Sequence, residues 1–459
     1  IEMVPCIQTL AHLERALHWP QIDPDTRDTE DILMVDEPKT YAWIEDMITA
    51  LRAAFRSNRI HIGMDEAWML GLGNYRLRHG IEPAHKLMAR HLEKVRDIAR
   101  RHGFSPMIWS DMYLCAASPT GEYYNAVDPI PEEVVRSVCE GVSLVYWDYV
   151  HEDEQDYDRM LRLHRQFGGE TMFAGGLWTW IGPAPAQDKM RRASIPALRA
   201  CEKNGVDTVV GTAWGDNGAE CSLLAALYGM QLYAEYNYTG ATDTDWLDAR
   251  FLACTGEPAA PFALMSQFNT PPGVVSRDEN PVNVSKFLLY EDPLIPLYAR
   301  DTQGMCFSGF YADLAERFAA FRGQTPAFEK LYRFYEAFAR LMAAKCRWRE
   351  NLPALCVETT GQGIALAQDC RAEIARCRLA WEALWEQVNK PFGYEIIDLR
   401  LSGLDGRYET TLRKLERLRG GDTTVLALVR EEKLRVLSDE EGRFYGIGAW
   451  SDCVSACKI

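Results

Sequence analysis

The chain has 459 residues, 47% of them hydrophobic, and a formal net charge of −16. This length and composition allow a large buried core and more than one domain. The negative charge and the lack of a Lys/Arg cluster argue against a nucleic-acid partner, and no apolar run approaches the roughly 20 residues that cross a membrane.

The cysteine content bears on the cellular setting. The 13 cysteines form no CxxC pair and are few for a disulfide-stapled scaffold of this length, so we expect a reducing, cytoplasmic environment. Because the sequence begins at Ile1 and not at Met, a signal peptide further upstream is left open.

Residues 1 to about 235 alternate short apolar strands with amphipathic helical segments. The six predicted strands are 1–7, 59–64, 105–110, 142–147, 171–176 and 207–214. The helical stretch 83–103 is typical of the segments between them, with apolar residues at intervals of three and four and a glycine at its end. Strands that are apolar at nearly every position imply a parallel sheet covered by helices on both faces. We therefore predict an α/β fold, with a (β/α)8 TIM-type barrel as the leading form.

From about residue 241 the pattern changes to long helices with no strands between them. The predicted helical stretches are 311–323, 327–351, 366–389 and 406–419, and a Pro- and Asn-rich loop covers 269–285. We predict a catalytic barrel over 1–240 and an α-helical C-terminal domain over 241–459. Whether the helical domain supports the barrel or covers its rim in a homodimer is left open.

Acidic and aromatic residues follow the predicted strands, where the loops of a parallel barrel carry the active site. These candidates are His12, Asp65, Glu66, Trp109, Trp147, Tyr149, Trp178, Trp180, Trp214 and Asp216. Tryptophan rings stack on the apolar face of a sugar, and carboxylates accept hydrogen bonds from its hydroxyls. The set indicates a carbohydrate pocket. Two further acids at strand ends, Asp111 and Asp148, are equally well explained as helix caps or supports and are left out of the candidate site.

The sequence predicts no metal site and no cofactor. It contains no HExxH motif, no His-x-His at a strand end and no EF-hand spacing. The segment "GLGNYRLRHG" (71–80) lacks both the GxGxxG spacing and the lysine of a phosphate-binding loop.

Asp65 and Glu66 are neighbours in the sequence, and this limits what the two carboxyls can do. A conventional glycosidase pair flanks the scissile bond from opposite sides, about 5 Å apart or more. A different division of labour fits neighbours better. Glu66 would protonate the leaving oxygen, while Asp65 would orient a 2-acetamido group of the substrate, whose oxygen attacks C1 to give an oxazolinium ion.

The segment "HIGMDEA" (61–67) resembles the His-x-Gly-x-Asp-Glu motif of the glycoside hydrolase family 20 β-N-acetylhexosaminidases. The resemblance covers residues 1 to about 235. The segments "YWDY", "AWGDNGAE" and "NKPFG" are most similar to the subgroup that includes hexosaminidase D, in which a helical region follows the barrel. The resemblance implies an exo-acting, retaining enzyme that removes terminal β-linked GlcNAc or GalNAc from oligosaccharides by substrate-assisted catalysis. It also implies that the six predicted strands are barrel strands 3 to 8. Either the family's first two strands, with a sugar-binding arginine, precede Ile1, or the sheet is open.

The resemblance assigns roles to four of the polar candidates. Glu66 matches the general acid/base and Asp65 the carboxylate that orients the acetamide. His12 matches a histidine that hydrogen-bonds the acid. Asp216 stands where many members have a glutamate that binds the 4- and 6-hydroxyls of the sugar, and its shorter side chain would relax discrimination between gluco and galacto epimers.

The aromatic candidates match the family less completely. Trp109, Trp147 and Trp214 match tryptophans that wall the pocket. The family's tyrosine that donates to the acetamide oxygen has no direct counterpart, and three candidates remain for that hydrogen bond: Trp178, Trp180 and Tyr149.

Two other hypotheses remain from the sequence alone. A non-catalytic carbohydrate-binding protein, or an inactive fragment of such an enzyme, would keep the tryptophan-rich edge without turnover. A β-glycosidase that ignores the acetamide would cleave plain β-glucosides equally well.

Overall fold

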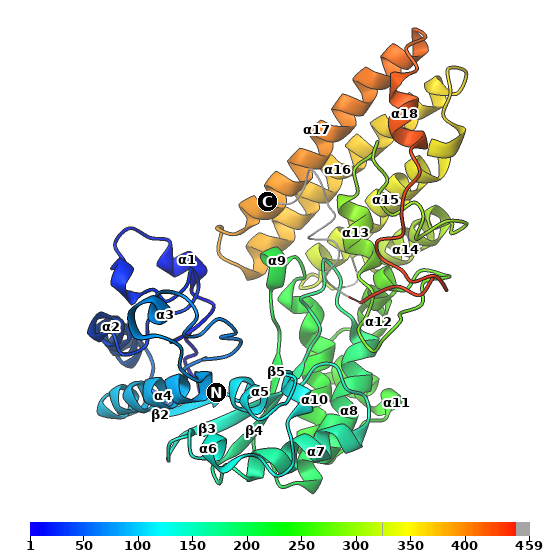
Figure 1. Cartoon of the computed structure of the whole chain (residues 1–459). Coiled ribbons are helices and arrows are strands. Elements are labelled where there is room, and N and C mark those ends of the chain that lie inside the picture. Colours follow the sequence, from blue (N-terminus) through cyan, green and yellow to red (C-terminus); the bar gives the residue numbers. More distant parts are fainter. Residues whose placement is uncertain (324, 447–459) are drawn as a thin grey trace. The chain divides into compact units, whose positions relative to one another are not determined.

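The computed structural model describes residues 1–323 and 325–446, and its central element is a sheet of five strands in sequence order (Figure 1). The strands are β1 (Arg59–His61), β2 (Ser105–Trp109), β3 (Ser143–Trp147), β4 (Thr171–Gly176) and β5 (Val209–Thr212). The pairs β1–β2, β2–β3 and β3–β4 are parallel, with Ile60 opposite Pro106 and Ile108 opposite Leu144. Consecutive parallel strands joined through helices confirm the predicted α/β class with a TIM-type sheet.

The first predicted strand, 1–7, is not a strand in the structure. The segment makes one isolated parallel bridge, from Cys6 to His61, with a hydrogen bond from Ile7 N to His61 O and another from His61 N to Pro5 O, both 2.9 Å long. It therefore runs along β1 where a sixth strand would lie. Pro5 has no N–H to extend the pairing, and this limits the ladder to a single bridge.

The chain packs as two compact units. The first contains residues 1–175 and 196–210, and the second contains residues 176–195 and the chain from residue 211 onward. The units are defined by the contacts within each of them. The domain boundary at residue 240, which rests on the sequence pattern, stays a prediction.

In the first unit, helices α2 (Pro38–Ala54) and α4 (Ala84–Arg101) pack against each other, and α4 also packs on β2. The apolar stripe of α4 is buried as its periodicity predicts, with Leu92 and Val95 fully inside the core. The other helices of this unit are α1 (Glu14–Leu17), α3 (Asn74–His79), α5 (Asp111–Ala116), α6 (Glu132–Val135) and α7 (Glu154–Arg165).

The strands of the first unit present alternate residues to two separate cores. Ile108, Leu144 and Phe173 join the core beneath the helices. Met107, Trp109, Val145, Met172 and Ala174 form a second cluster. Because side chains alternate along a strand, Trp109 lies on the opposite face from the helices, at the carboxyl end of β2. Trp147, at the carboxyl end of β3, packs against both clusters.

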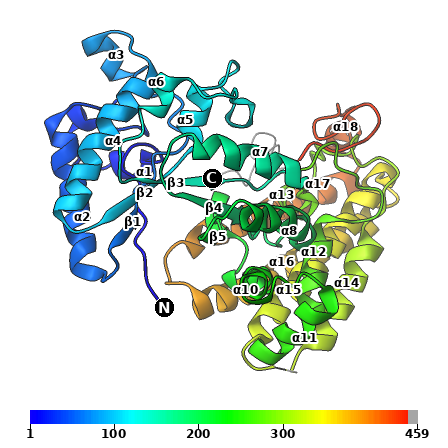
Figure 2. The ribbon, with the colours of Figure 1, turned by 90° about the horizontal axis from the view of Figure 1, so that it is seen from below.

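The second unit is built around four long helices, each packed against the next: α14 (Ser308–Phe321), α15 (Glu329–Asn351), α16 (Thr360–Val388) and α17 (Tyr394–Arg419) (Figure 2). They contain most of the four predicted helical stretches and confirm a helical C-terminal region, although α17 begins well before the predicted residue 406. Aromatic contacts join α15 to α16, where Phe334 meets Trp381 at 4.8 Å between ring centroids.

The second unit also contains α9 (Asp216–Ala219), α10 (Leu227–Thr239), α11 (Thr244–Thr255), α12 (Ala260–Ser266), α13 (Val284–Tyr290) and α18 (Thr424–Arg430). Helix α8 (Gln187–Lys203) is divided between the two units at Pro196. Among the described helices, none has both the length and the apolar composition needed to cross a membrane.

Candidate functional site

The two adjacent carboxyls after β1 share one cationic neighbour. Nε2 of His12 lies 3.2 Å from Oδ2 of Asp65 and 3.4 Å from Oε2 of Glu66. Hydrogen bonds to Asp65 and Glu66 raise the pKa of His12 to about 10, so the imidazole carries a positive charge at neutral pH. A single imidazolium therefore compensates the repulsion between the two acids.

Asp65 is the more buried of the pair and is held from both sides. Its side chain is 17% exposed, against 41% for Glu66. Its Oδ1 accepts a hydrogen bond of 2.8 Å from Nε2 of Gln8. Burial acts to raise the pKa of Asp65, but the hydrogen bonds from His12 and Gln8 outweigh it and the pKa is lowered. Asp65 is therefore ionised at neutral pH.

The turn that carries the acids has an unusual backbone. Gly63, Met64 and Glu66 all have positive φ, at 70°, 73° and 51°. Left-handed conformations at residues other than glycine are unfavourable and concentrate at functional sites. A β-carbon at Gly63 would lie 2.0 Å from Oε1 of Gln8, so the motif requires glycine for its conformation and for its space.

Asp111, at the start of α5, supports the acid turn from below the surface. Its Oδ2 accepts a 2.8 Å hydrogen bond from the backbone N–H of Glu66, and its Oδ1 accepts one of 3.4 Å from Nε1 of Trp147. Its side chain is fully buried. Burial, with the nearby charge of Asp65, raises the pKa of Asp111 to about 7. This one carboxyl ties the acid turn to an aromatic residue of β3.

The aromatic candidates of the first unit line the end of β2 and β3. Trp109 is 5% exposed, and its ring lies 4.3 Å from that of His61 between centroids. Trp147 is half-buried and stacks on Tyr149 at 5.4 Å with an interplanar angle of 23°. Burial lowers the pKa of His61 to about 4, so this imidazole is neutral. The first unit thus brings His12, Asp65, Glu66, Trp109, Trp147 and Tyr149 to the loops that follow β1, β2 and β3.

The second unit holds the remaining aromatic candidates. Trp178 and Trp180 stack at 4.6 Å with an interplanar angle of 26°, and both are buried. Nε1 of Trp178 has no hydrogen-bond partner among the described residues. Trp214 is 38% exposed, and its backbone oxygen accepts a 3.0 Å hydrogen bond from Oγ1 of Thr179.

Asp216 is exposed and begins α9, which is a tight turn and not a regular helix because Asn217 and Gly218 have non-helical backbone angles. The three residues after it, Asn217, Gly218 and Ala219, all have positive φ. Asn217 and Gly218 are residue types that adopt this conformation readily, so the backbone cost of the turn falls on Ala219.

Two protein-family models match the chain. The catalytic domain of glycosyl hydrolase family 20 matches residues 8–146, and the glycoside hydrolase 20C C-terminal domain matches residues 260–445. The chain belongs to glycoside hydrolase family 20. The family resemblance predicted from "HIGMDEA" is confirmed, and the hexosaminidase D-like subgroup stays a prediction.

Solved structures of family 20 enzymes are similar over parts of their length. The β-N-acetylhexosaminidase of Streptomyces coelicolor is 18% identical with a TM-score of 0.26, and the similarity covers 39% of this chain and 32% of that one. A mutant Streptomyces plicatus β-hexosaminidase with its product GlcNAc is 19% identical with a TM-score of 0.26, at the same coverage. The chitobiase of Flavobacterium johnsoniae is 12% identical with a TM-score of 0.36, covering 100% of this chain and 65% of that one.

The chain spans about a third of the length of the two Streptomyces structures. A search of curated protein sequences finds no match.

The candidate site contains two residues that the sequence analysis does not place in it. Gln8 holds Asp65 and also accepts a 3.3 Å hydrogen bond from Met64 N through its Oε1. Its position in "QTLAH", four residues before His12, is the only sequence signal for it. Asp111 was weighed and left out, although it bonds the backbone of Glu66. Asp148 is a support as expected, since it accepts hydrogen bonds from Tyr146 and from the backbone of Val150.

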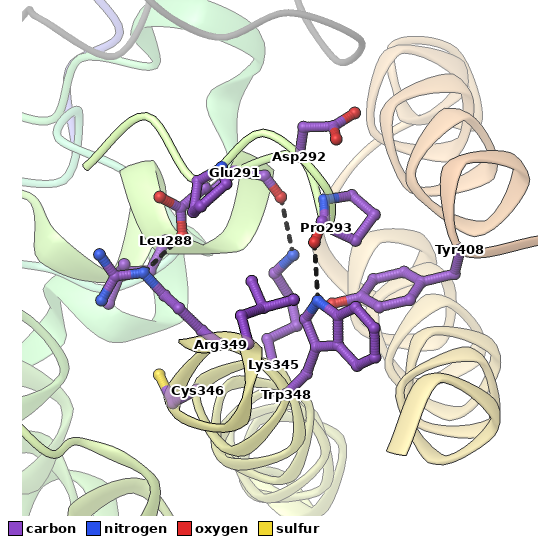
Figure 3. A pocket seen from close by; sticks show the side chains of 11 residues that line it. Leu288, Glu291, Asp292, Pro293, Lys345, Cys346, Trp348, Arg349 and Tyr408 are labelled. Carbon is purple, nitrogen blue, oxygen red and sulfur yellow. Dashed lines mark hydrogen bonds and ion pairs between the residues drawn. The ribbon is translucent and has the colours of Figure 1, made fainter. Parts of the chain in front are cut away.

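A small cavity in the helical region is structural (Figure 3). Its free volume is about 10 Å³, room for about one water molecule. Lys345 donates to the backbone oxygen of Glu291 at 3.0 Å, and Nε1 of Trp348 donates to that of Pro293 at 2.8 Å. Both side chains point from α15 to the segment after α13 (Figure 3) and fasten it to the bundle.

Proposed function

We propose that the chain is an exo-acting, retaining β-N-acetylhexosaminidase that removes terminal β-linked GlcNAc or GalNAc. The observation that carries the proposal is the contact of one imidazole nitrogen of His12 with both Asp65 and Glu66, at 3.2 Å and 3.4 Å. A shared cation reduces the repulsion between the two acids, so that both carboxyls can face one substrate and play different roles. The family 20 match over residues 8–146 supports the same assignment.

In the proposed reaction the substrate's acetamide oxygen attacks C1 and the bond from C1 to the leaving oxygen breaks. In the reactive form Glu66 is protonated and the His12 imidazolium pairs with Asp65, so Glu66 donates its proton to that oxygen and the alcohol leaves neutral. Asp65, ionised and fixed by His12 and Gln8, accepts a hydrogen bond from the acetamide N–H and stabilises the positive charge of the oxazolinium ion. Water then attacks C1, Glu66 takes the water's proton, and the acetamide re-forms with the β configuration retained.

The remaining candidates supply binding. Trp109 and Trp147 offer aromatic surface at the ends of β2 and β3, suited to the apolar face of a sugar ring. Trp214 and Asp216 offer an exposed ring and an exposed carboxylate on one turn, the combination that contacts a sugar face and its hydroxyls.

The test compares substrates that differ only in the acetamide. The full-length protein is expected to hydrolyse 4-nitrophenyl β-GlcNAc and not 4-nitrophenyl β-glucoside, because the glucoside lacks the internal nucleophile. A thiazoline mimic of the oxazolinium should inhibit at a lower concentration than free GlcNAc. Equal cleavage of both substrates would contradict the acetamide mechanism, and sugar binding without hydrolysis would identify a non-catalytic lectin.

A further inference from the structure

The turn 214–220 is held by a buried ionic network that comes from the helical region. Glu220 closes the turn, and its carboxyl is bonded by three side chains. Nη1 of Arg400 donates to Oε1 at 2.9 Å, Nζ of Lys286 lies 3.0 Å from Oε2, and the hydroxyl of Tyr290 also donates to Oε1. Lys286 and Tyr290 belong to α13 and Arg400 belongs to α17, so two helices distant in sequence converge on one carboxyl.

Because the charged groups of this network are buried, they are stable only when they are paired with one another. The side chains of Glu220 and Lys286 are 1% exposed and that of Arg400 is 5% exposed. A buried carboxylate without its partners is strongly unfavourable, so the turn is stable only where the cations reach it. Arg400 also stacks on Tyr290, with its guanidinium carbon 5.7 Å from the ring centroid, and this restricts its rotamers.

Arg400 also acts on the backbone of the turn. The same Nη1 donates to the carbonyl oxygen of Asn217 at 2.5 Å. Asn217 is the first of the three left-handed residues, and a β-carbon at Gly218, whose φ is 110°, would lie 3.1 Å from that nitrogen. The guanidinium therefore holds the carbonyl at the start of this left-handed segment and lies close to Gly218, where a β-carbon would crowd it.

Asp216 lies within reach of the same charges. It immediately precedes Asn217, and its carboxylate interacts electrostatically with the ammonium of Lys286. The two acids, Asp216 and Glu220, are thus balanced by the two cations, Lys286 and Arg400. A shift of the Asn217 carbonyl would move the main chain of Asp216, and a hydrogen-bonding site tolerates only about 0.5 Å of such displacement.

We propose that Arg400 and Lys286 are positioning residues of the sugar site, through which the helical region sets the conformation of the turn 214–220 and the placement of Asp216. This inference deepens the proposed hexosaminidase function and rests on it for the consequence at the sugar. The consequence is discrimination at the 4-hydroxyl, because that is the contact a carboxylate at Asp216 would make. The helical region is then part of the specificity machinery and not only a scaffold.

The experiment compares Arg400→Met with Arg407→Met in the full chain. Arg407 is a matched control because it lies on the same helix and pairs with another buried carboxylate, Asp292, at 2.6 Å. Hydrogen–deuterium exchange is measured over residues 211–222, together with kcat and KM for the β-GlcNAc and β-GalNAc 4-nitrophenyl substrates. Arg400→Lys is included as the conservative variant, which keeps the charge but lacks the planar guanidinium that stacks on Tyr290.

We expect faster exchange over the turn in Arg400→Met only, with KM for the β-GlcNAc substrate raised about tenfold and a smaller change in kcat. The ratio of kcat/KM between the two epimers should move by about threefold or more, and Arg400→Lys should restore part of each change. Equal exchange and equal epimer ratios in the Met variants of Arg400 and Arg407 would overturn the proposal. If Arg400→Met does not fold, the same comparison is made with Arg400→Lys.

The exchange measurement separates this inference from the proposed function. A wild-type chain without hydrolytic activity whose turn loosens only in the Arg400 variant would refute the hexosaminidase assignment and keep the positioning role. If the wild-type chain is active and exchange over the turn is the same in the Arg400 variant, the hexosaminidase assignment is kept and the positioning role is refuted.

Discussion

The backbone N–H of Glu66 donates a 2.8 Å hydrogen bond to Oδ2 of Asp111. The contact joins the acid turn after β1 to the first residue of α5, which follows β2. Because Glu66 has a positive φ, its amide points inward to a buried carboxyl while its side chain remains 41% exposed. The orientation of the proposed acid therefore depends on a fully buried carboxyl that follows the neighbouring strand.

Replacement of Asp111 by Asn should change how stability varies with pH. The pKa of this carboxyl is about 7 in the folded protein against an ordinary value of 3.8. Between these values the folded chain binds more protons at Asp111 than the unfolded chain, so the group's contribution to stability falls as pH rises from about 4 to about 7. Asn does not titrate. Urea unfolding at about pH 5 and pH 7.5 should show the wild type losing stability relative to Asp111→Asn across that window.

Asp148→Asn is the control for the Asp111 variant. Asp148 is also a buried acid just after a strand, but it bonds Tyr146 and the backbone of Val150 and not the acid turn. Asp111→Asn should lower kcat/KM. The two oxygens of Asp111 accept from Glu66 N and from Nε1 of Trp147, and an asparagine amide has only one oxygen to replace them. Asp148→Asn should affect stability alone. The same loss of activity in both would show that Asp111 has no specific role.

Gly63→Ala should destabilise the protein more than Gly103→Ala. Both glycines have left-handed φ, at 70° and 77°, so both variants incur the conformational cost of about 1 kcal/mol. Only at Gly63 does the new β-carbon collide with Gln8, at 2.0 Å, since nothing lies within 4 Å of a β-carbon at Gly103. Thermal unfolding should separate the variants by about 1–3 kcal/mol. Equal losses would mean that Gln8 moves aside freely and does not clamp the turn.

His12→Gln should remove a stabilisation that is lost in alkali. Hydrogen bonds to Asp65 and Glu66 raise the pKa of His12 from 6.5 to about 10. A raised pKa means that the stabilisation is fully present below about pH 6.5 and disappears as pH rises through about 10. The unfolding free energy of the wild type should exceed that of His12→Gln near neutral pH, and the difference should shrink toward pH 10. The side chain is 43% exposed, so the effect is reduced by solvent screening. A difference that does not vary with pH would contradict a charged bridge.

Glu66→Gln should abolish the proton donation and keep the shape of the site. The loss in kcat/KM should be about 10²-fold to 10⁴-fold for a 4-nitrophenyl substrate, and smaller for a 2,4-dinitrophenyl substrate, whose leaving group needs no proton. Steady-state kinetics on the two substrates provide the measurement. A loss of the same size on both would assign Glu66 a role in binding instead of acid catalysis.

The central strands could be located from the sequence because their signal is local. Residues 171–176 were predicted as a strand and form β4 over the same range, since an apolar run between polar segments needs no information from elsewhere in the chain. The predicted strand 1–7 is wrong for an equally local reason, because Pro5 has no N–H for the ladder and the segment makes one bridge, to His61.

The sequence by itself determined the succession of strands and helices, the acids at the end of β1 and the family motif that contains them. It could not reveal that Gln8 clamps Asp65, that Asp111 holds the amide of Glu66, or that Arg400 reaches the turn of Asp216. The physical reason is that the hydrophobic periodicity of a helix or strand lies within the residues of that element, so each element can be predicted from its own sequence. A buried hydrogen bond joins residues that are distant in the sequence, and it exists only once the tertiary packing has excluded water and brought the polar groups together.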